Sequence, residues 1–258
     1  MRKLVILERE EEASLISLND EGSFNSLSEG LLKELFAALK EADEDHSTKV
    51  LILRGVGRGF SAGHNLKEVQ GNQDESFYRN LMACSKKVMT ILPNLNKPVI
   101  AEVHGVATAA GCQLVAACDL AYADTETKFA TPGVNIGLFC HTPLVSVSRT
   151  IAKKHSMEML LLGEMVEATE AKRFGLINDV FEPEELHERV MTVAKTISSK
   201  SSYILKLGKE TFYKQLNMSL EEAYEYASER MIKNLLAEDA KEGIDAFLNK
   251  RDPKWKNS

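Results

Sequence analysis

The stretch that decides the fold is residues 98–114, which read PVIAEVHGVATAAGCQL. Residues 98–103 are a mostly apolar run that begins with proline, and proline is tolerated at the first residue of a strand. Small residues fill positions 107–111, and a short helix is expected from there to Cys118. Because the first N–H groups of a helix lack partners within it, its positive end favours a developing negative charge.

A second stretch of the same kind lies earlier in the chain. Residues 50–53 are a continuous apolar run, typical of a strand buried on both faces, and residues 59–66 after it read GFSAGHNL. Ligands tend to bind beyond the carboxyl ends of parallel strands, where small residues let them approach the backbone. The two stretches predict two backbone donors aimed at one oxyanion. The alternative is that the small residues serve only close packing between strand and helix.

The pattern along the rest of the chain predicts an α/β fold. Ser26 and Glu29 have the spacing of a capping box and open a helix whose apolar stripe ends at Leu39; Ser219 and Glu222 repeat that spacing. Further strands are expected at residues 4–7, 13–18 and 120–123, and helices at residues 74–92, 144–162, 168–174, 183–199, 202–215 and 219–249. Alternating strands and helices imply right-handed parallel crossovers, so we predict one α/β core with a helical C-terminal portion.

Length, composition and charge exclude several classes of protein. The 258 residues are 44% hydrophobic and 27% charged, as in an ordinary globular protein, and the net charge is −6. Without a basic excess, a nucleic-acid partner is not expected. No apolar run approaches the roughly 20 residues of a membrane span, and the acidic residues at positions 8–12 do not fit a targeting peptide. We therefore predict a cytoplasmic protein that does not associate with membranes.

Absent motifs exclude several chemistries. No GxGxxG follows a strand, and neither GK[ST] nor GxSxG occurs, so the common nucleotide-binding loops and the hydrolase nucleophile elbow are not expected. The 6 histidines have no metal-ligand spacing, and no metal is expected. The 4 cysteines form no CxxC pair and are interpreted as small buried hydrophobic residues in a reducing compartment.

Longer motifs, taken in order along the chain, indicate a family. The first half contains NSLS at residues 25–28, FSAGHNLKE at 60–68, and PVIA, AGCQL and CD within 98–119. The second half contains FATPGVNIG at residues 129–137, LG at 162–163, and EGIDAF at 242–247. Together with residues 168–176, these motifs resemble the crotonase superfamily, also called the enoyl-CoA hydratase/isomerase family. The resemblance covers essentially the whole chain, and the ordered set is specific where one motif alone is weak.

The resemblance implies a fold, an assembly and a ligand. The fold would be a spiral of ββα turns, the ClpP-like superhelix of crotonases, with a C-terminal helical region that drives trimerisation. Residues 1–195 would form the spiral core with the acyl-CoA site, and residues 196–258 the oligomerisation region. The expected assembly is a homotrimer, or a hexamer built as a dimer of trimers. The ligand would be an acyl-CoA thioester, with no cofactor apart from the CoA of the substrate.

The resemblance also implies roles for individual residues. The backbone N–H groups of His64 and Ala110 would hold the thioester oxygen and stabilise the enolate, and these residues lie in the two stretches described above. The His64 side chain is expected to point outward. The backbone near Ala62 and Leu66 would border the adenine of CoA, and Lys67 would meet a CoA phosphate.

Two positions depart from the family pattern. In the hydratases, two glutamates hold and activate the water that adds to the double bond, and here these positions are Gln113 and Gly133. A glutamine side chain is neutral and accepts no proton at pH 7, although it can orient water through hydrogen bonds. Glycine supplies no side chain. Hydration by the usual pair of glutamates is therefore not expected, and the glutamate that isomerases retain is equally absent.

The segment from Phe139 to Pro143 contains the substitutes. His141 is the predicted acid/base, because histidine titrates near neutral pH and related proteins place a catalytic group in this segment. Cys140 is a second candidate, with a packed structural thiol as the alternative. Residues 109–115, 129–140 and 208–216 resemble a branch of the family that also lacks the paired glutamates.

Three functions remain open at this point. We predict an enzyme that acts on an acyl-CoA through an enolate, as a lyase or isomerase of fatty acid metabolism. The alternative is a non-catalytic pseudo-enzyme that binds acyl-CoA. A third reading is a purely structural partner in an oligomer.

Overall fold

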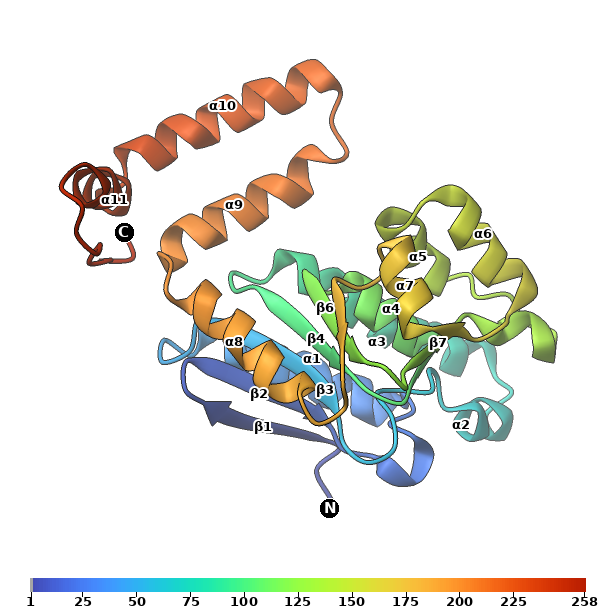
Figure 1. The fold of residues 1–258 in the computed structure, drawn as a ribbon. Helices are drawn as coiled ribbons and strands as arrows, with labels where there is room; N and C mark the ends of the chain where they lie inside the picture. Colours follow the sequence, from blue (N-terminus) through green and yellow to red (C-terminus); the bar gives the residue numbers. More distant parts are fainter. Residues whose placement is uncertain (1) are drawn as a thin grey trace.

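The computed structural model describes residues 2–258, and its centre is a six-stranded sheet (Figure 1). The strand order is β1-β2-β3-β4-β6-β9, with β1 antiparallel to β2 and every other neighbouring pair parallel. The strands are β1 (Val5–Glu10), β2 (Ala13–Leu18), β3 (Val50–Gly55), β4 (Val99–Val103), β6 (Leu120–Asp124) and β9 (Asp179–Phe181). The predicted α/β class with parallel crossovers is confirmed.

A second, smaller sheet supports the loops at the end of the first. Its strands are β5 (Val106–Thr108), β7 (Lys128–Ala130) and β8 (Val166–Glu167), with β5 parallel to β7 and β7 antiparallel to β8. Sequence patterns predicted none of these three strands, nor β9. Each is only two or three residues long, which is too short for a period of two to be recognised.

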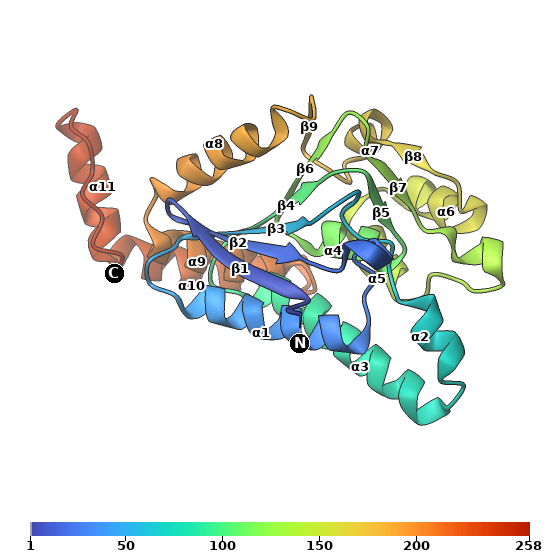
Figure 2. The same cartoon turned by 90° about the horizontal axis from the view of Figure 1, so that it is seen from below.

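Helices cover both faces of the main sheet (Figure 2). Helices α1 (Glu29–Glu44) and α3 (Glu75–Ile91) lie on one face, and α8 (Leu186–Ser198) lies on the other. The stripe on α1 is buried as predicted, with Leu31, Leu35 and Leu39 fully inaccessible. Because both faces are covered, all six residues of β2 are buried, including its two serines.

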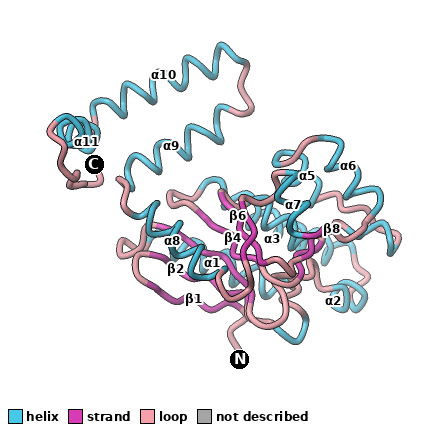
Figure 3. Tube along the Cα trace, in the orientation of Figure 1, coloured by secondary structure: helices cyan, strands magenta, loops and turns pink. Residues whose placement is uncertain are grey.

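The remaining helices follow the sequence pattern with two exceptions: α2 was not predicted, and two long predicted helices are interrupted where the sequence has neither glycine nor proline. They are α2 (Leu66–Gly71), α4 (Ala110–Ala117), α5 (Pro143–Thr150), α6 (Lys153–Leu162), α7 (Ala168–Phe174), α9 (Ser202–Gln215), α10 (Leu220–Leu236) and α11 (Glu238–Leu248). The single helices predicted at 144–162 and 219–249 were wrong. Extended residues divide them, Ile151 and Ala152 between α5 and α6 and Ala237 between α10 and α11 (Figure 3).

The two predicted capping boxes have different outcomes. Ser219 and Glu222 form a complete capping box at the start of α10, as predicted. Helix α1 begins later than expected: Ser28 is its N-cap and accepts a hydrogen bond from the Leu31 N–H at 3.2 Å. The Ser26 hydroxyl is buried and has no partner. The prediction of a capping box at Ser26 was therefore wrong, because two residues of extended chain precede the first turn.

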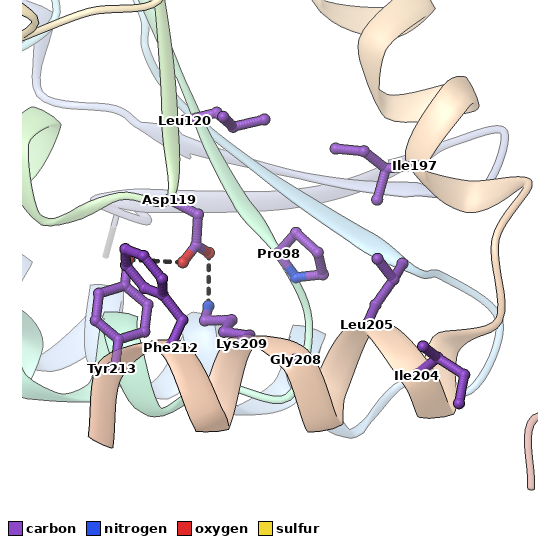
Figure 4. A pocket seen from close by; sticks show the side chains of 10 residues that line it. All are labelled: Pro98, Asp119, Leu120, Ile197, Ile204, Leu205, Gly208, Lys209, Phe212 and Tyr213. Carbon is purple, nitrogen blue, oxygen red and sulfur yellow. Dashed lines mark hydrogen bonds and ion pairs between the residues drawn. The ribbon is translucent and has the colours of Figure 1, made fainter. Parts of the chain in front are cut away.

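Helices α9, α10 and α11, here called the C-terminal arm, extend away from the sheets (Figure 1). A buried lysine fixes the arm to the core. The Lys209 ammonium donates to the Asp119 carboxylate at 2.6 Å and to two backbone carbonyls at 2.9 Å, and the Tyr213 hydroxyl donates to Asp119 at 2.8 Å (Figure 4). These bonds border a cavity of about 390 Å³ between α9 and the end of the sheet.

The C-terminal arm exposes several large apolar side chains. Leu220 and Phe247 are 77% and 82% exposed, and other large apolar side chains of α10 and α11 are also exposed. The predicted boundary between residues 195 and 196 falls in the last turn of α8, and that division into two regions stays a prediction. None of the helices within residues 2–258 combines the length and the apolar character needed to cross a membrane.

Candidate active site

The two stretches singled out in the sequence lie side by side. The Ser61 N–H donates to the Val106 carbonyl at 3.0 Å, and the Thr108 N–H donates back to the Ser61 carbonyl at 2.9 Å. The Thr108 hydroxyl donates to the Ala62 carbonyl at 3.1 Å. The loop after β3 is therefore paired with β5, immediately before α4 begins.

Glycines allow this close approach. Gly63 has φ of +86°, and a Cβ there would lie 2.8 Å from the Thr108 carbonyl oxygen and 3.1 Å from the Ala110 nitrogen. A Cβ at Gly111 would overlap the Ser61 carbonyl oxygen. Small residues at both positions bring the backbone around His64 against the start of α4.

The two predicted donors are both free. Among the described residues, neither the His64 N–H nor the Ala110 N–H donates a hydrogen bond to a protein acceptor. Ala109, just before α4, has φ of 49° and ψ of −116°, which is a strained conformation for a residue with a side chain. It is held by hydrogen bonds from its N–H to the Ala130 carbonyl at 2.9 Å and from the Gln113 N–H to its own carbonyl at 3.0 Å.

The two positions at which the resemblance implies glutamates in hydratases lie on different elements, Gln113 on α4 and Gly133 in the 3-10 turn after β7. Gln113 is one turn into α4 and only 4% exposed, and its Oε1 has no hydrogen-bond partner. At Gly133 the Cys140 Sγ lies 3.1 Å, and the Leu138 carbonyl oxygen 3.0 Å, from where a Cβ would be. A side chain at position 133 would therefore meet the Cys140 thiol and the Leu138 carbonyl closely at its first carbon.

The thiols near the site are held in their protonated form. Burial raises the pKa of Cys112 to about 12, with the nearby Cys140 contributing in the same direction. Burial also raises the pKa of Cys140. Because the thiolate is the nucleophilic form, this environment favours the reading of Cys140 as a packed structural thiol.

The two histidines of the predicted site lie in opposite environments. His141 is exposed, and its ring packs against that of Phe139 with 5.2 Å between the centroids. His64 is half-buried, and its Nε2 is inaccessible and has no partner. Burial lowers the pKa of His64, which favours the neutral imidazole. The expectation that the His64 side chain points outward was wrong, because the imidazole nitrogen is enclosed where the loop packs on its neighbours.

The residues predicted to contact CoA lie at the edge of the same loop. Ala62, Leu66 and Lys67 are all exposed. Asn65 caps α2, and its Oδ1 accepts from the Lys67 and Glu68 N–H groups at 3.1 Å each. This cap fixes Leu66 and Lys67 in the first turn of α2, beside the His64 backbone.

Sequence reasoning missed two polar side chains in this region, those of Ser26 and Thr131. Both are buried, and both hydroxyl oxygens lack partners. Their positions inside the motifs at residues 25–28 and 129–137 were the only signal available in the sequence, since serine and threonine are common in packed loops.

Comparison with known proteins decides the family. The family model described as enoyl-CoA hydratase/isomerase matches residues 8–258. The chain belongs to this family. Members of known structure share its fold: an enoyl-CoA hydratase from Mycobacterium smegmatis is 41% identical with a TM-score of 0.96, and the alignment covers 98% of this chain and 99% of that one. The predicted crotonase fold with C-terminal helices is thus confirmed.

Relatives at higher identity point to one branch of the family. Enoyl-CoA hydratase domain-containing protein 3 of Rattus norvegicus is 46% identical over 231 residues, which cover 90% of this chain and 77% of the relative. The crystal structure of the human protein of that name is 42% identical with a TM-score of 0.95, covering 98% of this chain and all of that one. The predicted similarity to this branch is confirmed.

The names of the rat and human sequences include the word mitochondrial. The cytoplasmic location of the present chain stays a prediction.

Proposed function

We propose that this member of the enoyl-CoA hydratase/isomerase family binds an acyl-CoA thioester and stabilises its enolate between two backbone N–H groups. The donors are those of His64 and Ala110. One observation carries the proposal: both N–H groups are free, and Gly63 packs directly against the Ala110 nitrogen. In general, each such donor that points at a developing oxyanion contributes about 10²–10³-fold to a reaction rate.

The surroundings of the donors support a CoA thioester as the ligand. The Ala110 N–H lies in the first turn of α4, where the helix dipole adds positive potential. Ala62 and Leu66 offer exposed surface for the adenine, and the exposed Lys67 offers a positive charge for a CoA phosphate. No cofactor apart from the CoA of the substrate is part of the proposal.

The reaction proposed is a lyase or isomerase step that passes through the enolate. Loss of the α-proton places negative charge on the thioester oxygen, where the two N–H groups would hold it. Gln113 would orient a water molecule, and His141 would take up and return a proton. Hydration by two glutamates is not part of the proposal, since neither Gln113 nor Gly133 supplies a carboxylate.

A second candidate is a protein that binds acyl-CoA without converting it. The observation in its favour is that the space beside Gly133 is occupied by the Cys140 thiol, whose raised pKa makes it a poor base or nucleophile. Such a protein would keep the two backbone donors for binding alone.

Exchange of the α-proton separates the two candidates. The purified protein is incubated with butyryl-CoA in deuterated water, and deuterium at the α-carbon is followed by mass spectrometry, alongside binding measured by calorimetry. Exchange above the protein-free rate that falls by at least about tenfold in the combined Gln113→Ala and His141→Ala variant supports the enzyme and its residues. Exchange unchanged in that variant contradicts the residue roles.

Two other results would decide between the candidates. Tight binding without exchange would identify the non-catalytic protein. Failure of any thioester to bind more tightly than free CoA would overturn both candidates.

The proposed assembly is a homotrimer, or a dimer of trimers, formed through the C-terminal arm. Its support is the row of exposed apolar side chains on α10 and α11, because large apolar patches are rare on monomers. Sedimentation analysis of the purified chain tests it, and a monomer at micromolar concentration would contradict it.

A further inference from the structure

Residues 24–27, here called the 24–27 turn, lie beside the loop that carries His64, the first of the two proposed donors. Phe24 and Asn25 in this turn have φ of 54° and 53°. This left-handed conformation is uncommon for residues with a side chain, although asparagine adopts it more readily than most. Asn25 is also fully buried. Strained residues of this kind persist only where the surrounding structure holds them, and they gather at functional sites.

The Asn25 side chain uses both of its donor hydrogens and its acceptor oxygen. Its Nδ2 donates to the Val56 carbonyl at 2.9 Å and to the Gly59 carbonyl at 2.8 Å. Its Oδ1 accepts from the Asp20 N–H at 2.8 Å. Since Val56 and Gly59 follow β3, one buried carboxamide ties the turn to the loop that leads to His64.

The loop is held along two edges. Three hydrogen bonds join it to the 24–27 turn: from the Ser61 hydroxyl to the Asn25 carbonyl at 2.9 Å, from the Ala62 N–H to the Phe24 carbonyl at 2.9 Å, and from the Leu27 N–H to the Gly63 carbonyl at 2.7 Å. On the other edge, the Ser61 backbone pairs with β5. The loop therefore lies between the turn and β5.

The bond from Leu27 sets the direction of the His64 N–H. In a planar trans peptide, the C=O of one residue and the N–H of the next point in opposite directions. No peptide bond within residues 2–258 is cis. Because the Gly63 carbonyl points at Leu27, the His64 N–H points away from the turn, toward the edge that β5 occupies. Helix α4, which begins with the second proposed donor Ala110, starts just after β5.

We infer that Asn25 is a positioning residue of the oxyanion hole. Its side chain holds the 24–27 turn, the turn holds the Gly63 carbonyl, and the peptide of that carbonyl aims the His64 N–H. This inference rests on the proposed function, because the aim of a donor matters only where a thioester oxygen accepts from it. A misplacement of about 1 Å far from the chemistry can lower a rate about 10²-fold, so a buried residue without substrate contact can control the reaction.

Infrared spectroscopy and α-proton exchange test the inference in the full chain. Hydrogen bonds to a thioester carbonyl lower its stretching frequency, and butyryl-CoA labelled with carbon-13 at that carbonyl isolates the band. Asn25→Gly is the main variant, since glycine keeps the left-handed backbone and removes the side chain. The frequency shift on binding should be smaller in this variant. Exchange at saturating butyryl-CoA should fall about 10²-fold, as for loss of one oxyanion donor, while the affinity for free CoA should stay unchanged.

A milder variant and a matched control accompany Asn25→Gly. Ser61→Ala removes the hydroxyl that donates to the Asn25 carbonyl and accepts from the Gly63 N–H at 3.3 Å. Exchange should fall about tenfold, the equivalent of one hydrogen bond. Ser14→Ala is the control, because Ser14 is buried and its hydroxyl pairs with that of Thr48 at 2.8 Å, beside the amino end of β3. It should lower stability without changing the frequency shift or the exchange rate.

The outcomes separate this inference from the proposed function. A frequency shift and an exchange rate that stay unchanged in Asn25→Gly and Ser61→Ala would overturn the inference and leave the oxyanion hole in place. Equal losses in Ser14→Ala would also overturn it, because the effect would then follow stability. If Asn25→Gly does not fold, Ser61→Ala decides between these outcomes.

The frequency shift needs no turnover, so it tests the inference equally in a protein that only binds acyl-CoA. If bound butyryl-CoA shows neither a shift nor exchange with the unmodified protein, the proposed function fails and this inference fails with it.

Discussion

The proposed oxyanion half of the candidate site consists of backbone N–H groups, whereas the half proposed to handle protons consists of side chains. The first half depends on packing: Gly63 and Gly111 permit a backbone contact that larger residues would prevent. The second half depends on residue identity, and Gln113 and Gly133 stand at the two positions where the resemblance implies glutamates. Backbone chemistry is thus tied to the stability of the fold, while side-chain chemistry can be replaced independently.

The largest effect is expected from breaking the backbone half. Gly111→Ala would drive a methyl group into the Ser61 carbonyl and should lower the free energy of unfolding by about 3 kcal/mol, as overpacking does. Urea unfolding of the Gly111→Ala variant measures this change in free energy. Gly208→Ala on α9 is the control, since no atom lies within 4 Å of its Cβ position, and it should raise stability by up to about 1 kcal/mol. Equal stabilities of the two variants would show that the contact at Gly111 is not tight.

Restoring one carboxylate tests the side-chain half. Gln113→Glu introduces a base beside the free N–H groups and should raise α-proton exchange of butyryl-CoA by about 10²-fold, the low end for general base catalysis. The gain should grow with pH, because burial at this position raises the pKa of a carboxyl. Gln113→Met is the control for the change of shape. A rate no higher than that of the unmodified protein would show that position 113 does not face the α-carbon.

Substitution of two neighbouring serines distinguishes a side chain that stabilises the fold from one that does not, and the expected effects are smaller. Ser28→Ala removes the N-cap of α1 and should reduce the free energy of unfolding by about 1 kcal/mol. Ser26→Ala removes a hydroxyl that pairs with nothing and should leave stability unchanged or slightly higher. Thermal unfolding of both variants gives the comparison. A larger loss at Ser26 than at Ser28 would mean that Ser26 stabilises the fold after all.

The smallest effect concerns two histidines whose pKa values shift in opposite directions. Burial opposes the charged form of His187, but hydrogen bonds and charge from Glu102 and Glu10 outweigh it and raise the pKa. Protonated His187 therefore adds to the free energy of unfolding at pH values below the ordinary pKa of histidine. This contribution is lost as the pH rises through the raised pKa of His187 in the folded protein. For His64, burial lowers the pKa. Its neutral imidazole carries no penalty at pH values above the ordinary pKa of histidine, and the free energy of unfolding falls as the pH drops through the lowered pKa.

The free energy of unfolding, measured between pH 8 and pH 5.5, tests the two expected directions of pH dependence. The stability difference between the unmodified protein and His187→Gln should grow as pH falls, by less than about 1 kcal/mol because the pair is partly exposed. The difference for His64→Gln should shrink over the same range. Parallel trends for the two variants would contradict the burial of the His64 imidazole.

Long patterns and ordered motifs were the parts of this protein that could be predicted. The stripe on α1, the apolar strand at 50–53 and the capping box at Ser219 all followed from periodicity or spacing, since each depends on residues close together in the chain. The short strands β5, β7, β8 and β9 could not be predicted, because pairing with distant segments stabilises them. The ends of α5 at Ile151 and of α10 at Ala237 could not be predicted either, since neither is marked by glycine or proline.

By itself, the sequence determined the family, the two small-residue stretches and the loss of both glutamates, because these are statements about residue types in order along the chain. Only the tertiary structure decided which polar groups are left without partners. In the structure, Ser28 rather than Ser26 is the N-cap of α1. The Nε2 atom of His64 is buried, and the Cys140 thiol lies beside Gly133. Burial and hydrogen bonding depend on which distant segments meet, and that information becomes available only when the chain is folded.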